Sequence, residues 1–242
     1  MLDLTPIRAI SLDLDDTLWP IWPTIERAER ALQDWLRVHA PAAARLGQDP
    51  EVLRQIRKEV QTQWAGGSHD LAGLRREAIR RLLVQASEPA ELAPAAFEVF
   101  HAERQNVELF PDALPVLNFL KERYPLMALS NGTADVWRVG LGEHFTHAVN
   151  APTLGKAKPE PDIYLHAAQL MGLAPHQVLH IGDDAHLDAW GARNAGLACI
   201  WLNRDDKPWT LPGPAVPTVR SLTQVDRKST RLNSSHSQQS RM

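Results

Sequence analysis

Short apolar runs alternate with helix-like patterns over most of the chain, and this alternation predicts an α/β fold. Most of the runs end in small or polar residues, which is typical of buried strands. Strands are expected at residues 7–14, 126–129, 147–150, 178–181 and 197–202, with a short one near 218–219. Helices are expected at residues 113–123, 134–140, 162–171 and 187–194. Alternation with short links predicts a parallel sheet with helices on both faces.

A long helical segment interrupts this alternation between the first two expected strands. Apolar residues recur there at helical spacing, as in Ile56 and Val60, which places them on one face of a helix. This pattern predicts helices at residues 24–39, 51–64, 71–85 and 94–106. Four successive helices favour a bundle. We therefore expect a helical domain at residues 20–106, inserted into an α/β core made of residues 1–19 and 107–225.

The composition of the 242 residues suits a globular protein, because 44% are hydrophobic and 23% are charged. A disordered chain would be poorer in apolar residues. No apolar run reaches the roughly 18 to 20 residues that a membrane-spanning helix needs, and the first residues lack the features of a secretory signal. The single cysteine, Cys199, excludes an internal disulfide and favours a reducing compartment. We therefore expect a cytoplasmic protein without a membrane partner, in which Cys199 is a small buried side chain.

The last segment, residues 226–242, reads DRKSTRLNSSHSQQSRM and matches the translation of a common sequencing adapter. We interpret it as foreign to the natural protein and expect it to be disordered, so that its deletion leaves the kinetics unchanged. It carries four basic residues and one acid, so the net charge of −3 for the whole chain becomes −6 without it. This acidic balance argues against a nucleic-acid partner.

Polar side chains follow the ends of the expected strands or lie on the loops between them. They are Asp13, Asp15, Ser130, Asn131, Lys158 and Asp183. In open parallel sheets, ligands bind beyond the carboxyl ends of the strands. Clustered carboxylates repel one another unless a hard cation neutralises them, so the pattern indicates Mg²⁺. A lysine and a hydroxyl beside a metal suit an anionic oxygen group, which indicates a phosphate substrate.

These residues form four motifs that resemble those of the haloacid dehalogenase-like hydrolase superfamily. The motifs are Asp-x-Asp-x-Thr at residues 13–17, the strand-end Ser130, the pair Lys158-Pro159, and the acidic stretch 182–188. The resemblance covers residues 7 to about 222, and four motifs in order are far more specific than any one of them. It implies a Rossmann-like core whose helical insertion is a C1-type cap domain.

The resemblance also implies an enzyme, a phosphatase that works through an aspartyl-phosphate. Asp13 would be the nucleophile, and Asp15 would protonate the leaving oxygen and then activate water. Mg²⁺ would be held by Asp13, the backbone carbonyl of Asp15, and Asp183. Asp188 would act behind these ligands or through water, while the contribution of Asp184 is left open.

The phosphoryl group would be bound by Ser130 and Lys158, with Asn131 helping to position the site. Lys156 is interpreted as a solvated neighbour, because Lys158 is the lysine that precedes the proline. Other residues near the motifs are expected to have ordinary structural roles rather than catalytic ones. These are Asp16 as a helix or flap cap, His180 and His186 as packing or surface residues, Trp19 and Trp22 as packing or entrance residues, and Arg75 and Arg76 as a solvated face.

Within the superfamily, the sequence is similar to a bacterial group of YigB-type phosphatases. The similarity is carried by residues 13–19, 140–145, 179–184 and 198–201. It implies a riboflavin-pathway substrate, either 5-amino-6-(5-phospho-D-ribitylamino)uracil or flavin mononucleotide (FMN). The alternatives are another phosphometabolite, such as a sugar phosphate or nucleotide, a phosphomutase, and a non-catalytic regulatory module. A dehalogenase is disfavoured because it has no use for the acid at Asp15. The sequence makes no prediction of the oligomeric state.

Overall fold

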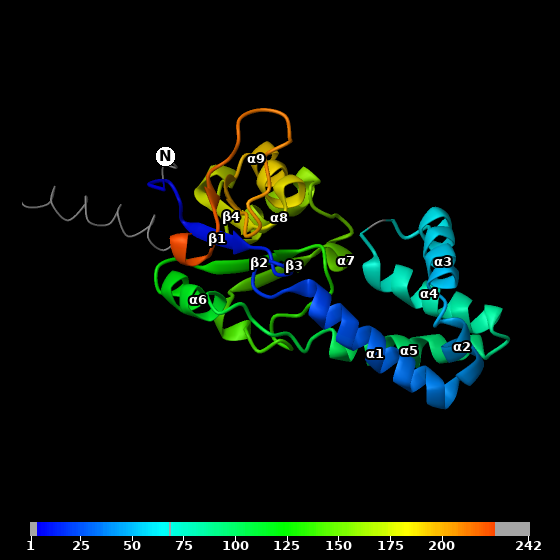
Figure 1. Cartoon of the computed structure of the whole chain (residues 1–242). Helices are drawn as coiled ribbons and strands as arrows, with labels where there is room; N and C mark the ends of the chain where they lie inside the picture. Colours follow the sequence, from blue (N-terminus) through cyan, green and yellow to red (C-terminus); the bar gives the residue numbers. More distant parts are fainter. Residues whose placement is uncertain (1–3, 68, 226–242) are drawn as a thin grey trace, which may run out of the picture.

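The computed structural model describes residues 4–67 and 69–225 and contains one parallel sheet within them (Figure 1). The strands are β1 (Ala9–Leu12), β2 (Leu126–Ser130), β3 (His147–Asn150), β4 (Val178–Gly182), β5 (Ala198–Leu202) and β6 (Thr218–Val219). Their order is β3-β2-β1-β4-β5-β6, and every neighbouring pair is parallel. The predicted parallel α/β sheet is therefore confirmed.

Both faces of the sheet are covered because alternate side chains of each strand enter different apolar clusters. Leu12 belongs to the cluster that includes Leu117 of helix α6 (Ala113–Lys121). Met127 of the next strand belongs to the opposite cluster, together with Ile163 of helix α8 (Pro161–Leu170). Because the strands are buried on both faces, their carboxyl ends are the places where polar groups can reach a ligand.

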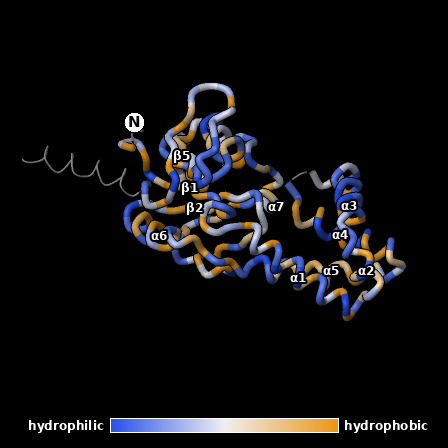
Figure 2. Tube along the Cα trace, in the orientation of Figure 1, coloured by the Kyte–Doolittle hydropathy of each residue, from blue (hydrophilic) through white to orange (hydrophobic). Residues whose placement is uncertain are grey.

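Between β1 and β2 the chain forms a helical insertion that extends away from the sheet (Figure 1). Its elements are α1 (Ile21–His39), α2 (Pro41–Leu46), α3 (Pro50–Gln63), α4 (Leu71–Gln85), the 3₁₀ turn η1 (Ala90–Leu92) and α5 (Ala93–Glu103). They bury an apolar cluster of their own, and Figure 2 shows apolar and polar positions intermixed along these helices. The bounds of a separate cap domain at 20–106 stay a prediction.

Two of the expected elements differ from the structure for local reasons. The segment 134–140 is wrong as a helix, because it forms turns in which the Asp135 carboxylate accepts from the backbone N–H of Trp137. The expected helix at 187–194 begins earlier and is split into η4, a π-helix (Ala185–Trp190), and α9 (Gly191–Asn194).

Two short helices and two 3₁₀ turns complete the elements of the described residues and were not expected from the sequence. Pro41 ends α1, as expected, but it also occupies the first turn of α2, where a missing N–H costs nothing. The others are α7 (Ala151–Leu154), η2 (Gly142–His144) and η3 (Pro175–Gln177). These segments are four residues or fewer, except α2, and such lengths leave little periodicity to detect.

The remaining structural expectations concern single features. Cys199 is buried and free, as expected. In the described part of the chain, no helix has the length and apolar character required to cross a membrane. The segment 226–242, interpreted as a translated adapter, lies outside the described residues.

Candidate active site

The order of the strands brings the ends of β2, β1 and β4 together at one edge of the sheet. The chain runs outward from β1 in both directions, through β2 to β3 and through β4 to β6. Ligands bind at such a reversal of strand order. Ser130 is the last residue of β2, while Asp13 and Asp183 directly follow β1 and β4. The strand-end residues that were separate in the sequence therefore meet here.

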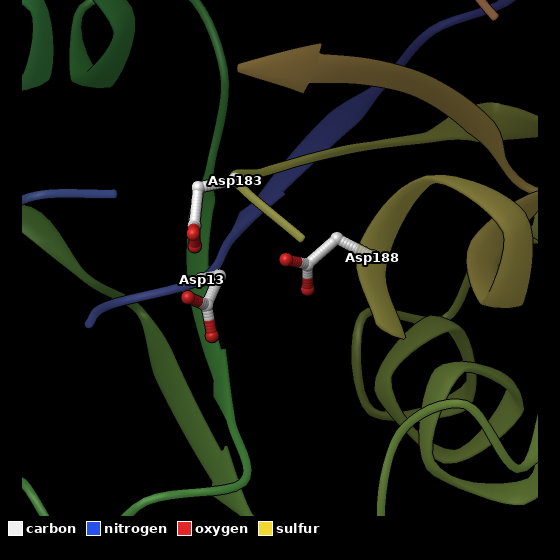
Figure 3. Close-up of side chains that lie close together, drawn as sticks. All are labelled: Asp13, Asp183 and Asp188. Carbon is white, nitrogen blue, oxygen red and sulfur yellow. The ribbon is translucent and has the colours of Figure 1, made fainter. Parts of the chain in front are cut away.

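Three carboxylates form a compact cluster at this edge (Figure 3). One oxygen from each of Asp13, Asp183 and Asp188 lies within 4.8 Å of the others. Asp13 and Asp183 follow strands, whereas Asp188 projects from η4 (Figure 3). The hydroxyl of Thr17 connects two of them, since it lies 3.4 Å from Asp13 Oδ2 and 3.3 Å from Asp183 Oδ1.

Lys158 is the buried cation of the site. Its Nζ lies 2.5 Å from Asp13 Oδ1 and 2.6 Å from Asp188 Oδ1, and its side chain is only 2% exposed. Burial alone would lower the pKa of this ammonium, but Asp13 and Asp188 raise it above its ordinary value. The same lysine holds the pKa of Asp188 below its ordinary value against the effect of burial. Lys158 and Asp188 therefore remain charged.

Asn131 holds the loop that carries Lys158. Its side-chain oxygen accepts from the backbone N–H of Lys158 at 2.7 Å, and its side-chain nitrogen donates to the Lys158 carbonyl at 2.9 Å. Both polar atoms of the amide thus bind the loop, which agrees with the expected positioning role. Ser130 is buried beside it, and its hydroxyl accepts from the Gly132 N–H. Phosphate binding by Ser130 and Asn131 stays a prediction.

His180 lies behind Asp188 and was expected only as a packing or surface residue. It is fully buried, with Nδ1 2.8 Å from the Ser11 hydroxyl and Nε2 3.0 Å from Asp188 Oδ1. Burial lowers the pKa of His180 although Asp188 opposes this, so the ring is neutral at pH 7. Since a carboxylate only accepts, Nε2 carries the proton and Nδ1 accepts from Ser11.

The two oxygens of Asp188 are both engaged. Oδ1 accepts from Lys158 and His180, and Oδ2 accepts from the Asp184 N–H at 2.9 Å. Asp188 nevertheless belongs to the three-carboxylate cluster, so its place behind the metal ligands stays a prediction. Asp184 in turn caps η4, because its carboxylate accepts from the N–H groups of His186 and Leu187.

The carboxylate of Asp15 lies outside the three-carboxylate cluster and has its own partners. Trp19 Nε1 donates to Asp15 Oδ1 at 2.8 Å, and Arg104 Nη2 lies 2.5 and 2.6 Å from the two carboxylate oxygens. Trp19 is therefore a buried partner of Asp15 rather than simple packing. Arg104 was missed by sequence reasoning, because it lies 89 positions from Asp15, just beyond the end of α5.

The donor set fits a hard divalent cation. Burial, together with the charges of Asp188 and Asp183, raises the pKa of Asp13 although Lys158 opposes this. Burial and the charge of Asp188 raise the pKa of Asp183 to about 7. Asp13 and Asp183 thus resist ionisation beside the charged Asp188. A cation among the three carboxylates would favour their ionised forms. Hard oxygen donors of this kind suit Mg²⁺.

A cavity of about 380 Å³ opens between the insertion and the core. On the core side it is lined by Asp15, Gly132 and Thr133, and Arg104 borders it at the junction. The insertion contributes apolar side chains, the amide of Gln61, and the cations Arg57 and Arg75. Arg75 is not a freely solvated residue, because it pairs with Glu29 and lies over the Phe100 ring at 4.2 Å. The cavity thus joins a charged floor to an apolar wall.

Residues 7–196 match a family model described as haloacid dehalogenase-like hydrolase. The Escherichia coli (strain K12) 5-amino-6-(5-phospho-D-ribitylamino)uracil phosphatase YigB is 29% identical, with 90% of this chain and 96% of that protein aligned. The Methanopyrus kandleri glyceraldehyde 3-phosphate phosphatase is 29% identical over 82% of this chain and 84% of that protein.

Among solved structures, one titled 2-haloacid dehalogenase from Pseudomonas syringae pv. Tomato DC3000 has the same fold. Its sequence is 33% identical, its TM-score is 0.86, and the match covers 93% of this chain and 99% of that one. These similarities indicate the same family as the four sequence motifs, whose residues meet at the site.

Proposed function

The chain belongs to the haloacid dehalogenase-like hydrolase family and is a phosphatase within it, and we propose that it hydrolyses a small phosphate monoester through a phosphorylated Asp13. The observation that carries this proposal is the buried contact of Lys158 with Asp13, directly beside Asp183. A nucleophilic carboxylate must meet a dianionic phosphoryl group, and only nearby cations make that approach favourable.

The first half of the reaction transfers the phosphoryl group to the enzyme. An oxygen of Asp13 attacks phosphorus, the bond between phosphorus and the leaving oxygen breaks, and that oxygen takes a proton from Asp15. The product alcohol leaves, and Asp13 becomes an aspartyl-phosphate. Lys158 and Ser130 hold the phosphoryl oxygens throughout.

The second half regenerates the enzyme. Asp15, now a carboxylate, takes a proton from water as the water oxygen attacks phosphorus. The bond between phosphorus and Asp13 breaks and inorganic phosphate is released. The residues that would hold Mg²⁺ are Asp13, Asp183 and the backbone carbonyl of Asp15, and the ion would supply positive charge that offsets the charge of the phosphoryl oxygens.

We propose a riboflavin-pathway phosphate, 5-amino-6-(5-phospho-D-ribitylamino)uracil or FMN, as the substrate. The proposal is supported by the similarity to the E. coli phosphatase along nearly the full length of both chains. It is also supported by the cavity, where the apolar wall with Phe100 and the cation of Arg75 suit a flat heterocycle joined to a polar chain. Sugar phosphates and nucleotides remain the alternative class.

A dehalogenase is the rival that the Pseudomonas syringae structure raises. Displacing halide from a haloacid releases an anion that needs no proton, so this step would not use Asp15 as an acid. The structure instead shows Asp15 held by two donors at the edge of the cavity. These contacts hold the Asp15 side chain at the edge of the cavity, where a leaving oxygen could exchange a proton with it.

The test is phosphate release from a panel of phosphometabolites with Mg²⁺, alongside halide release from 2-chloropropionate. The panel contains the uracil precursor, FMN, sugar phosphates and nucleotides. We expect phosphate release, with the highest kcat/KM for one of the two riboflavin-pathway compounds, and no halide release. A higher kcat/KM for a sugar phosphate would refute the substrate, and halide release without phosphate release would refute the reaction. Conversion of a sugar phosphate into an isomer that carries the phosphoryl group on another hydroxyl, without phosphate release, would identify a phosphomutase.

A further inference from the structure

Asp15 receives a donor from each of the two chain segments that join the sheet to the helical insertion. Trp19 lies on the first crossing, between β1 and α1, and Arg104 lies on the second, directly after α5. Both donate to the Asp15 carboxylate, at 2.8 Å from Trp19 Nε1 and at 2.5 and 2.6 Å from Arg104 Nη2. The orientation of this carboxylate therefore depends on both crossings.

Arg104 is a buried arginine whose ion pair is with Asp15. Its side chain is 4% exposed, and within the described residues Asp15 is its only charged partner. The second amino nitrogen, Nη1, is buried and has no hydrogen-bond partner among the described residues. A buried guanidinium with a single counter-ion costs free energy that a surface arginine would avoid, so the contact indicates a function beyond stability.

The contact places Asp15 against the loop that follows Ser130, whose hydroxyl is predicted to bind phosphate. A Cβ atom added to Gly132 would lie 2.7 Å from Asp15 Oδ2 and 3.3 Å from Ser130 Oγ. The glycine thus allows the carboxylate to sit beside Ser130 at the floor of the cavity. A group in this place faces the leaving oxygen of an ester whose phosphoryl group is bound by Ser130.

We propose that Arg104 is a positioning residue for proton transfer, which holds Asp15 at the leaving oxygen and links its orientation to the end of α5. The inference rests on the proposed phosphatase activity and on Asp15 as its acid and base. Arg104 does not touch the reacting atoms. It fixes the Asp15 carboxyl group, which gives its proton to the leaving oxygen and, as a carboxylate, later takes one from water.

The effect of Arg104 is expected to depend on the leaving group. An alkoxide such as the one released from FMN needs a proton, whereas nitrophenolate is stable enough to leave without one. Misplacing a general acid costs about 10²- to 10⁴-fold in the step that needs it. Loss of Arg104 should therefore slow phosphoenzyme formation from an alkyl phosphate far more than from p-nitrophenyl phosphate.

The experiment compares Arg104→Met with the wild-type enzyme by rapid-quench measurement of phosphoenzyme formation from FMN and from p-nitrophenyl phosphate. We expect a loss of roughly 10²-fold or more with FMN and of less than about tenfold with p-nitrophenyl phosphate. Trp19→Phe, which removes only the N–H donor, should shift the ratio in the same direction by a smaller factor. Arg104→Lys keeps the positive charge on a shorter side chain and should recover part of the lost rate with FMN. If Arg104→Met does not fold, Arg104→Lys is compared with the wild-type enzyme in its place.

Arg27, in the second turn of α1, provides a matched control near the two crossings. This arginine of α1 pairs with Glu103 and Glu108 and donates to the Asn106 carbonyl, so it joins the two crossings without reaching Asp15. Arg27→Met should leave the ratio of the two substrates unchanged. An equal loss on both substrates in Arg104→Met and Arg104→Lys would overturn the positioning role while leaving the phosphatase intact. If the wild-type enzyme hydrolyses neither FMN nor p-nitrophenyl phosphate, the proposed function and this inference are overturned together.

Discussion

The ammonium of Lys158 lies 2.5 Å from the carboxylate of Asp13, across 145 positions of sequence. Both groups are buried, and Lys158 is held from behind by Asp188 and from its own backbone by Asn131. The lysine thus occupies a fixed place between the proposed nucleophile and an anionic anchor. A phosphoryl group that approaches Asp13 meets a cation that needs no reorganisation, which is the condition for strong electrostatic catalysis.

Replacing Lys158 with Met should lower kcat by about 10²- to 10³-fold, because the preorganised cation beside the reacting group is lost. The change also leaves Asp13 and Asp188 as buried carboxylates without their shared cation, so the thermal midpoint should fall. Phosphate release and thermal unfolding measure the two effects. Lys156→Met is the matched control, since this lysine is exposed and, among residues 4–67 and 69–225, its ion-pair partners are the exposed acids Glu160 and Asp162. Activity within threefold of wild type in the Lys158 variant would contradict the role of the lysine.

The raised pKa of Asp183 should make the thermal stability of the metal-free protein depend on pH. Burial and the charge of Asp188 raise its pKa to about 7, above the ordinary value of 3.8. Between about pH 4 and pH 7 the folded state therefore binds a proton at Asp183 that the unfolded state has released. The free energy of unfolding falls as pH rises through this range, because unfolding then releases that proton. With EDTA present, the thermal midpoint of wild type should fall over this range more steeply than that of Asp183→Asn.

Mg²⁺ should reverse this trend, because the ion competes with the proton for the same carboxylates. The rise in thermal midpoint on adding Mg²⁺ should be small near pH 5.5 and larger near pH 8, and activity should vanish with EDTA. Asp49→Asn serves as the control, since Asp49 is also a carboxylate that caps a helix but lies at the start of α3, in the insertion. An Mg²⁺ shift that is the same at both pH values, or full turnover in EDTA, would argue against a metal site at this cluster.

His180 should matter for stability through Asp188 and Ser11. His180→Phe preserves a ring of similar size but removes both hydrogen bonds, so Ser11 loses its partner and Asp188 keeps only one of the two donors to Oδ1. The free energy of unfolding should fall by about 1–3 kcal/mol, and kcat should fall because Lys158 shares that oxygen. Chemical denaturation measures the first effect. His186→Phe is the control, because His186 is exposed and stacks on Trp190, and equal stability of the two variants would contradict this account.

Much of the sheet and of the site's membership followed from local pattern. Buried strands with polar ends are visible as apolar runs, and parallel order brings those ends to one edge, so Asp13 and Asp183 could be expected together. The segment 134–140 failed because Asp135 offers its carboxylate to the N–H of Trp137, which favours a turn over a helix. That competition is not visible in hydrophobic periodicity.

The parts that could not be predicted depend on contacts between distant elements. Arg104 directly follows α5, and no motif or residue spacing in that helix marks it as part of the site. The packing of α5 against α1 brings it to Asp15. His180 lies within an apolar strand, where a histidine is ordinarily packing, and its partner Ser11 belongs to the neighbouring strand. The roles of Asp13, Asp15, Ser130, Lys158 and Asp183 in the reaction stay predictions that the geometry supports.

The most direct test of the central claim is to trap the phosphoryl group on Asp13. Asp15→Asn should still form the aspartyl-phosphate from p-nitrophenyl phosphate, whose leaving group needs no acid, and then accumulate it because water is no longer activated. Acid quenching and peptide mass spectrometry should find the mass of a phosphoryl group on the peptide that contains Asp13. Asp13→Asn should carry no phosphoryl group and show no turnover. Turnover in Asp13→Asn, with no phosphorylated peptide in Asp15→Asn, would contradict the account.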